Sequence, residues 1–149
     1  MSELTAALRA IFEGDGRERI VETARKVSSL KRDSFPSLDR QAVEQMARGY
    51  LAMILEHLDG EKREVRDYWV ETLAPGLMEH GRTLEQITRG GVIFSVIFAY
   101  SVVSSLPPEL RIEGAAWAAA FHGGLQADMT RECLAKMARD SSSTAPNTP

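Results

Sequence analysis

Apolar residues recur along this chain with the spacing of amphipathic helices. The first helix is predicted by four apolar residues at positions i, i+4, i+7 and i+8, namely Leu4, Leu8, Ile11 and Phe12. The same periodicity predicts a second helix over 17–30 and a third over 40–58. Asp39 directly precedes the third helix and is a residue type that caps helix N-termini. We therefore expect three helices in the first part of the chain.

A proline and a capping motif divide the middle of the chain. A fourth helix is predicted to begin near Glu61 and to end before Pro75, because a proline in a helix interior costs about 3 kcal/mol. Pro75 then begins a short separate turn that ends at His80, since proline is tolerated at the first helical position. Thr83 and Gln86 have the spacing of a capping box, which predicts that a longer helix begins directly after Thr83.

The segment 84–106 is the longest apolar stretch, and it has no charge between Arg89 and Glu109. A helix that is apolar on every face needs partners on every face, which predicts a central helix between other helices. The alternative is a membrane span. The apolar core of the segment, 92–103, is shorter than the ~20 residues that a span needs, so we expect no membrane association.

The pattern predicts an all-α fold. A last, alanine-rich helix is expected over 109–139, and the final residues offer almost no apolar surface, so we expect one domain over 1–139 and a disordered tail over 140–149. The β-branched residues of 92–103 favour a strand by propensity alone. A single strand has no pairing partner, so we expect a helix there as well.

Composition and charge narrow the function. The 149 residues are 44% apolar and 26% charged, and the net charge of −3 disfavours nucleic acid as a partner. One cysteine, Cys133, and the lack of an N-terminal secretory signal predict a cytoplasmic protein. Phosphate-binding loops, nucleophile elbows and zinc motifs are missing from the sequence, so we expect neither an enzyme nor a metal site.

Three histidines remain as candidates for chemistry, namely His57, His80 and His122. A lone histidine in a helical chain is usually structural or exposed. His80 differs from the other two because it directly precedes the long apolar helix, where a globin holds its haem iron.

The segment from the third predicted helix to the long apolar helix resembles the N-terminal sensor domain of the RsbR-type stressosome proteins. Its sequence is QAVEQMARGYLAMILEHLDGEKREVRDYWVETLAPGLMEHGRTLEQITRGGVIFSVIFAYSVVSSL. The likeness lies in the order and lengths of the helices, in the acidic linker after the third helix, in Gly81 before an apolar helix and in the long closing helix. It covers about residues 4–139. The C-terminal STAS domain of RsbR-type proteins is not part of this sequence.

The resemblance implies a globin-like bundle of about six helices, with a long buried central helix and without haem. It also implies a non-catalytic sensory and interaction domain of a bacterial stress-response signalling system, which contacts other signalling proteins. As in sensor globins, the central and last helices are expected to join two copies into a homodimer, through Val96, Tyr100, Trp117 and Phe121. The alternative is a haem-binding globin sensor of a diatomic gas with His80 as proximal ligand. A small helical adaptor, a lipid-binding bundle or an unrecognised enzyme are further alternatives.

Without haem, the domain must close with its own side chains the space that haem fills in a globin. Bulky apolar residues of the third, fourth and long helices are suited to this. We expect a pocket lined by Tyr50, Met53, Ile54, Trp69, Leu73, Leu77 and Phe94.

Overall fold

The computed structural model describes residues 1–30, 40–60 and 62–143 of the chain. All regular structure in these residues is helical, and none of them forms a strand, so the all-α prediction is confirmed. The cap expected at Asp39 lies outside the described residues.

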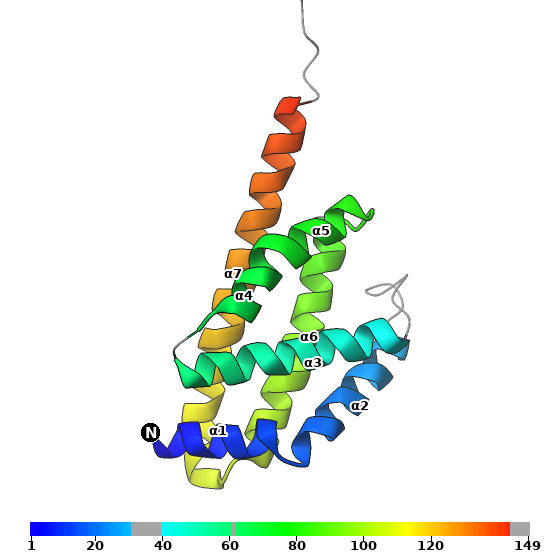
Figure 1. Cartoon of the computed structure of the whole chain (residues 1–149). Helices are drawn as coiled ribbons and strands as arrows, with labels where there is room; N and C mark the ends of the chain where they lie inside the picture. The colour runs from blue at the N-terminus through cyan, green and yellow to red at the C-terminus, as the bar shows by residue number, and fades with distance from the viewer. Residues whose placement is uncertain (31–39, 61, 144–149) are drawn as a thin grey trace, which may run out of the picture.

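The first three helices are α1 (Glu3–Glu13), α2 (Gly16–Leu30) and α3 (Arg40–Asp59), close to the predicted ranges. The hydroxyl of Ser2 accepts a hydrogen bond from the amide of Thr5 and so caps α1. The residues of α1 at helical spacing turn inward and are buried, namely Leu4, Leu8 and Phe12. Figure 1 shows α3 crossing the molecule at a large angle to the last two helices. It therefore lies across them and covers part of their inner side.

The next three elements form one continuous helix with a wide turn in its middle. They are α4 (Glu64–Tyr68), the π-helical η1 (Trp69–Leu73) and α5 (Ala74–Glu79), joined by residues in the right-handed helical conformation. The amide of Ala74 donates to the carbonyl of Trp69, five residues back, as in a π-helix. Pro75 follows directly; it has no amide hydrogen, and its ring would clash with the carbonyl four residues before it in a regular α-helix. The short helical element predicted from Pro75 to His80 is present as α5, but the wide turn joins it to α4, so the prediction that it is separate was wrong.

The last two helices are α6 (Leu84–Ser105) and α7 (Arg111–Ser143), linked by the short 3-10 turn η2 (Pro108–Leu110). The predicted capping box is confirmed, because the hydroxyl of Thr83 accepts from the amide of Gln86 while the side chain of Gln86 accepts from the amide of Thr83. No other pair of elements is in such extensive contact as α6 and α7. Counting α4, η1 and α5 as one, the described residues form six helices.

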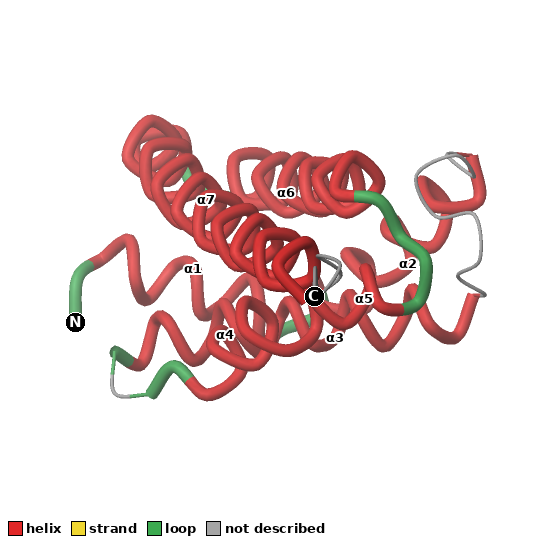
Figure 2. The backbone as a smooth tube through the Cα atoms, turned by 90° about the horizontal axis from the view of Figure 1, so that it is seen from above, coloured by secondary structure: helices red, strands yellow, loops and turns green. Residues whose placement is uncertain are grey.

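The two longest helices occupy one side of the molecule. Figure 2 shows α6 and α7 along one side, with α1, α3, α4 and α5 on the other. The core fills the space between these two groups, so α6 and α7 each have an inner and an outer face.

Helix α7 is longer than predicted. It continues through residues 140–143, which were expected to belong to a disordered tail, and this part of the prediction is corrected. The carboxylate of Asp140 pairs with Lys136 one turn earlier, and the hydroxyl of Ser142 donates to the carbonyl of Ala138, so these side chains support the last turn. Residues 144–149 lie outside the described part of the chain.

Candidate functional site

A hollow lies between α3, η1, α5, α6 and α7, with an interior volume of about 50 Å³ and almost entirely apolar walls. Five of the seven residues that were predicted to line a pocket do so, namely Tyr50, Trp69, Leu73, Leu77 and Phe94. Met53 and Ile54 do not line it, although both are fully buried. They lie one turn further along α3 than the lining residue Tyr50, so they belong to the neighbouring core.

Most of the wall that α6 contributes was not predicted from the sequence. Gln86, Gly90 and Phe94 line the hollow at i, i+4 and i+8, and Ile87 and Gly91 lie beside them. This helical spacing could have identified the wall, because residues four apart share one face of a helix. The remaining lining residues that the sequence did not single out are Met46, Ala74, Arg82 and Met129.

A polar pair lies in the core next to the hollow. The hydroxyl of Tyr50 and Nδ1 of His122 are joined by a hydrogen bond of 2.5 Å, and the two side chains are 0% and 5% exposed. Burial lowers the pKa of His122 to about 4 and raises the pKa of Tyr50 above its usual value. Both groups are therefore neutral at neutral pH, and the pair acts as a polar contact between α3 and α7.

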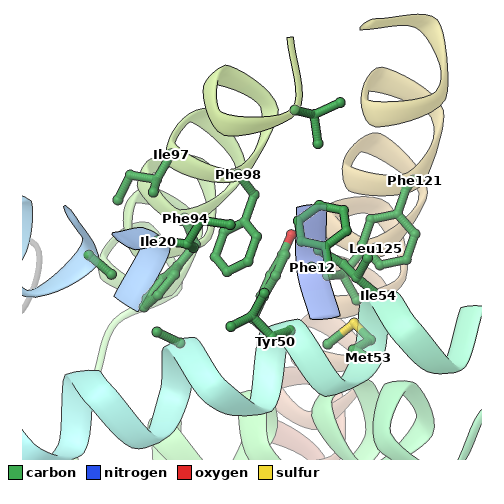
Figure 3. Packing of buried hydrophobic residues seen from close by; sticks show 14 of the residues in the cluster. Phe12, Ile20, Tyr50, Met53, Ile54, Phe94, Ile97, Phe98, Phe121 and Leu125 are labelled. Atoms are coloured by element: carbon green, nitrogen blue, oxygen red, sulfur yellow. The ribbon is translucent and has the colours of Figure 1, made fainter. Parts of the chain in front are cut away.

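Aromatic rings surround this pair. Figure 3 shows Tyr50 rising from α3 between Phe98 of α6 and Phe121 of α7. The ring centroids of Tyr50 and Phe98 are 4.6 Å apart, and those of Tyr50 and His122 are 5.5 Å apart and nearly parallel. Nε2 of His122 is buried and has no hydrogen-bond partner among the described residues. His122 is thus enclosed rather than exposed, a placement that its sequence neighbours Gly123 and Gly124 did not indicate.

His80 is exposed at the end of α5 and does not line the hollow. Its Nδ1 lies 2.8 Å from the carbonyl oxygen of Gly76, so the imidazole folds back on its own helix. For comparison, an engineered apolar cavity that binds benzene has a volume of about 150 Å³. The interior of about 50 Å³ is too small for a porphyrin, so the residues present do not fit haem with His80 as its ligand.

The four residues expected at a dimer interface fall into two groups. Val96 and Tyr100 lie on the outer face of α6 and are 61% and 73% exposed. Trp117 is only partly exposed, and Phe121 is 7% exposed and packs against Tyr50 and Trp117 inside the chain. Phe121 is therefore a core residue of the single chain, and α6 is buried on its inner face only.

Helix α6 is long and apolar enough, by length and composition, to cross a membrane, and it is the one such helix among the described residues. Its inner face is occupied by the folded domain, since Phe94, Phe98 and Val102 are at most 2% exposed. The core helix of a soluble protein meets the same criterion, so the composition of α6 does not by itself indicate a membrane span.

The described residues contain neither a group of metal ligands nor an activated thiol. No three His, Cys, Asp or Glu side chains among them are grouped so that they could hold a metal ion. Cys133 is buried, and its burial, together with the nearby Glu132, raises the pKa of the thiol. A thiol that stays protonated is a poor nucleophile.

No protein family, curated protein or solved structure matches this chain.

Proposed function

We propose that this chain is a non-catalytic sensory and interaction domain of a bacterial stress-response system, cytoplasmic and homodimeric, with α6 and α7 forming the contact between two copies. The observation that carries the dimer is the outer face of these two helices. The resemblance to RsbR-type sensor domains supports the signalling role, the globin-like character and the contacts with other signalling proteins.

The outer face of α6 carries large apolar side chains in contact with solvent. Val92, Val96 and Tyr100 follow one another at intervals of four residues and are 48%, 61% and 73% exposed. No charged residue interrupts α6 between Gly90 and Ser105. Apolar surface of this kind on a folded protein usually marks a contact with another molecule.

The neighbouring part of α7 is also without charge. Between Gly114 and Ala127 it has no acidic or basic residue, and His122 is buried and neutral. Its exposed positions in this stretch are all small, namely Ala115, Ala116, Ala119, Ala120, Gly123, Gly124 and Ala127. Small side chains allow the backbone of another helix to come close.

A second copy of this chain is the partner that this face fits best. An uncharged face matches a partner face that is uncharged too, and the two helices that carry these exposed apolar and small residues, α6 and α7, pack side by side. In a symmetric dimer the same patch meets itself, so one uncharged face serves both partners. Two copies would bring together four long helices, a common way of covering such faces.

The mass of the protein in solution tests the dimer. Light scattering at micromolar concentration should give twice the chain mass of 16.5 kDa. Val96→Glu should give a folded monomer. In a dimer, each subunit of this variant would bury an unpaired glutamate charge at a cost of several kcal/mol. The matched control is Tyr68→Glu, which changes an aromatic residue on α4 that is 54% exposed and should leave the dimer intact.

Two outcomes would contradict this proposal. If the wild-type protein stays monomeric at high micromolar concentration, the outer face of α6 and α7 does not mediate self-association. A monomer that sediments with lipid vesicles, and loses this with Val96→Glu, would show that a membrane covers the face instead.

A further inference from the structure

The inner wall of the hollow is made of aromatic rings and hydrocarbon. Three of its largest residues, Tyr50, Trp69 and Phe94, are 0%, 8% and 2% exposed. The hydroxyl of Tyr50 is already bonded to Nδ1 of His122. A molecule inside the hollow therefore lies against apolar atoms.

The charged and amide side chains of the lining are already engaged. Among the described lining residues these are Arg82 and Gln86, both partly exposed. The side chain of Gln86 accepts a hydrogen bond from the amide of Thr83, and Arg82 takes part in an interaction of its own. Recognition by the hollow therefore depends on its apolar wall, which favours a guest without charge.

Water is poorly suited to this interior. A buried water needs two to four polar partners, and apolar cavities stay dry and bind apolar molecules instead. A small apolar molecule needs no such partners and gains free energy from leaving water.

Small residues in the wall leave the space open. Ala74, Gly90 and Gly91 all line the hollow. At Gly91 an added Cβ would lie 2.2 Å from Nε2 of Gln126, so close contact with α7 accounts for this glycine. Ala74 is 2% exposed, and a larger apolar residue there would extend into the hollow. Protein interiors are otherwise closely packed, so a space of this kind is available to a guest.

The wall can adapt to what enters. Met46 of α3 and Met129 of α7 line the hollow, and methionine side chains change shape easily because they are unbranched. Trp69 and Leu73 come from η1, where the π-helical turn departs from regular α-helix. Such turns occur frequently at functional sites.

We propose that the hollow binds a small uncharged hydrocarbon of about two to four heavy atoms, held against Trp69 and Phe94 by apolar contact alone. Its interior of about 50 Å³ is a third of the volume of the engineered apolar cavity that binds benzene, about 150 Å³, so the guest is smaller than benzene. Binding involves a single chain. Failure of the dimer experiment therefore leaves this site untouched, and failure of this experiment leaves the dimer untouched.

Methionine methyl groups report on the hollow directly. The chain has six methionines, of which Met46 and Met129 line the hollow. Met1 and Met137 are 89% and 42% exposed, so their methyl groups report on non-specific contact. Protein labelled with ¹³C at the methionine methyls is titrated with propane and followed by NMR. A saturable shift is expected for the Met46 and Met129 signals and none for those of Met1 and Met137.

The size and polarity of the probe identify what is recognised. Ethanol has as many heavy atoms as propane, but its hydroxyl would be buried without a partner. It should bind at least about tenfold more weakly than propane. Benzene should give no saturable shift in the wild-type protein, because the interior is too small for it.

Three substitutions on α5 locate the site. Ala74→Leu extends a side chain from the wall into the hollow and should abolish the saturable shift with propane. Leu77→Ala enlarges the hollow and should allow benzene to bind saturably. Gly76→Ala is the matched control, since Gly76 does not line the hollow and an added Cβ there meets no atom within 4 Å. Circular dichroism checks that each variant is folded, and Leu77→Ala tests the proposal even if Ala74→Leu is not.

The proposal is overturned by any of three results. The first is a propane shift that rises linearly in all the methyl signals and never saturates, which is non-specific partitioning. The second is equal binding of propane and ethanol. The third is an Ala74→Leu protein that is folded and binds propane as the Gly76→Ala protein does.

Discussion

The hydroxyl of Tyr50 on α3 lies 2.5 Å from Nδ1 of His122 on α7, although 72 residues separate them in sequence. Both side chains are buried, and each supplies the other with a hydrogen-bond partner inside a largely apolar core. This contact ties α3 to α7 and makes the stability of the fold depend on the protonation of one imidazole.

Acid should destabilise the protein through His122. Burial lowers its pKa to about 4 from 6.5, so the unfolded chain takes up the proton first. The stabilisation is complete above about pH 6.5 and is lost as the pH falls toward 4. From about pH 7.5 to about pH 5 the free energy of unfolding should fall by about 2 kcal/mol from this group alone. Urea denaturation at the two pH values measures it.

The variant His122→Gln provides the comparison, because it removes the titrating group. Burial and the nearby Arg63 and Arg66 also lower the pKa of His57, which adds a loss of the same sign in both proteins. The His122→Gln protein should therefore show a smaller dependence on pH than wild type. Equal dependence in the two proteins would show that His122 is not held neutral by the fold.

Removing the hydroxyl of Tyr50 should cost about 1–3 kcal/mol, because Tyr50→Phe leaves Nδ1 of His122 buried without a partner. The double variant Tyr50→Phe/His122→Leu should recover part of this loss, since neither polar group then remains. Tyr68→Phe is the control, because Tyr68 is 54% exposed and its change should stay within about 0.5 kcal/mol. Chemical denaturation of the four proteins gives the comparison, and equal costs for Tyr50→Phe and Tyr68→Phe would contradict a stabilising role for the bond.

Two glycines near the end of α5 should respond to alanine in opposite directions. An added Cβ meets no atom within 4 Å at either Gly76 or Gly81, so packing does not decide the outcome. Gly76 lies inside α5, where alanine should stabilise by about 0.5–1 kcal/mol. Gly81 has a φ of 87°, where alanine should destabilise by about 1 kcal/mol and asparagine by less. Melting temperatures of the three variants test this, and a shift of the same sign for both alanines would be inconsistent with it.

The helices could be predicted because their signals are local. Apolar spacing located α1, α2 and α3, and the reciprocal contact of Thr83 and Gln86 marked the start of α6. The break expected at Pro75 does not occur, because the cost of an interior proline assumes a regular α-helix and the π-helical turn before Pro75 removes the clash.

The site could be predicted only in part, because its residues come from different helices. Five pocket residues were identified from their size and helix, but Arg82 and the α6 residues other than Phe94 were not. Periodicity could not show which of Val96 and Phe121 is exposed and which is buried, since in both helices the surrounding residues are uncharged on every side. Only the packing of the helices shows that Phe121 faces Tyr50 and that Val96 faces solvent.

Replacing His80 tests the alternative in which this domain binds haem. His80 is exposed, and within the described residues its imidazole is hydrogen-bonded to the Gly76 carbonyl of its own helix. His80→Ala should therefore lower the free energy of unfolding by less than about 1 kcal/mol. Haemin added to wild type should give no stoichiometric Soret band, because the hollow is too small for a porphyrin and His80 lies outside its lining. His57→Ala is the control for non-specific haemin binding to a histidine. A stoichiometric band in wild type and in His57→Ala that is missing from His80→Ala would establish His80 as an iron ligand and overturn the non-haem assignment.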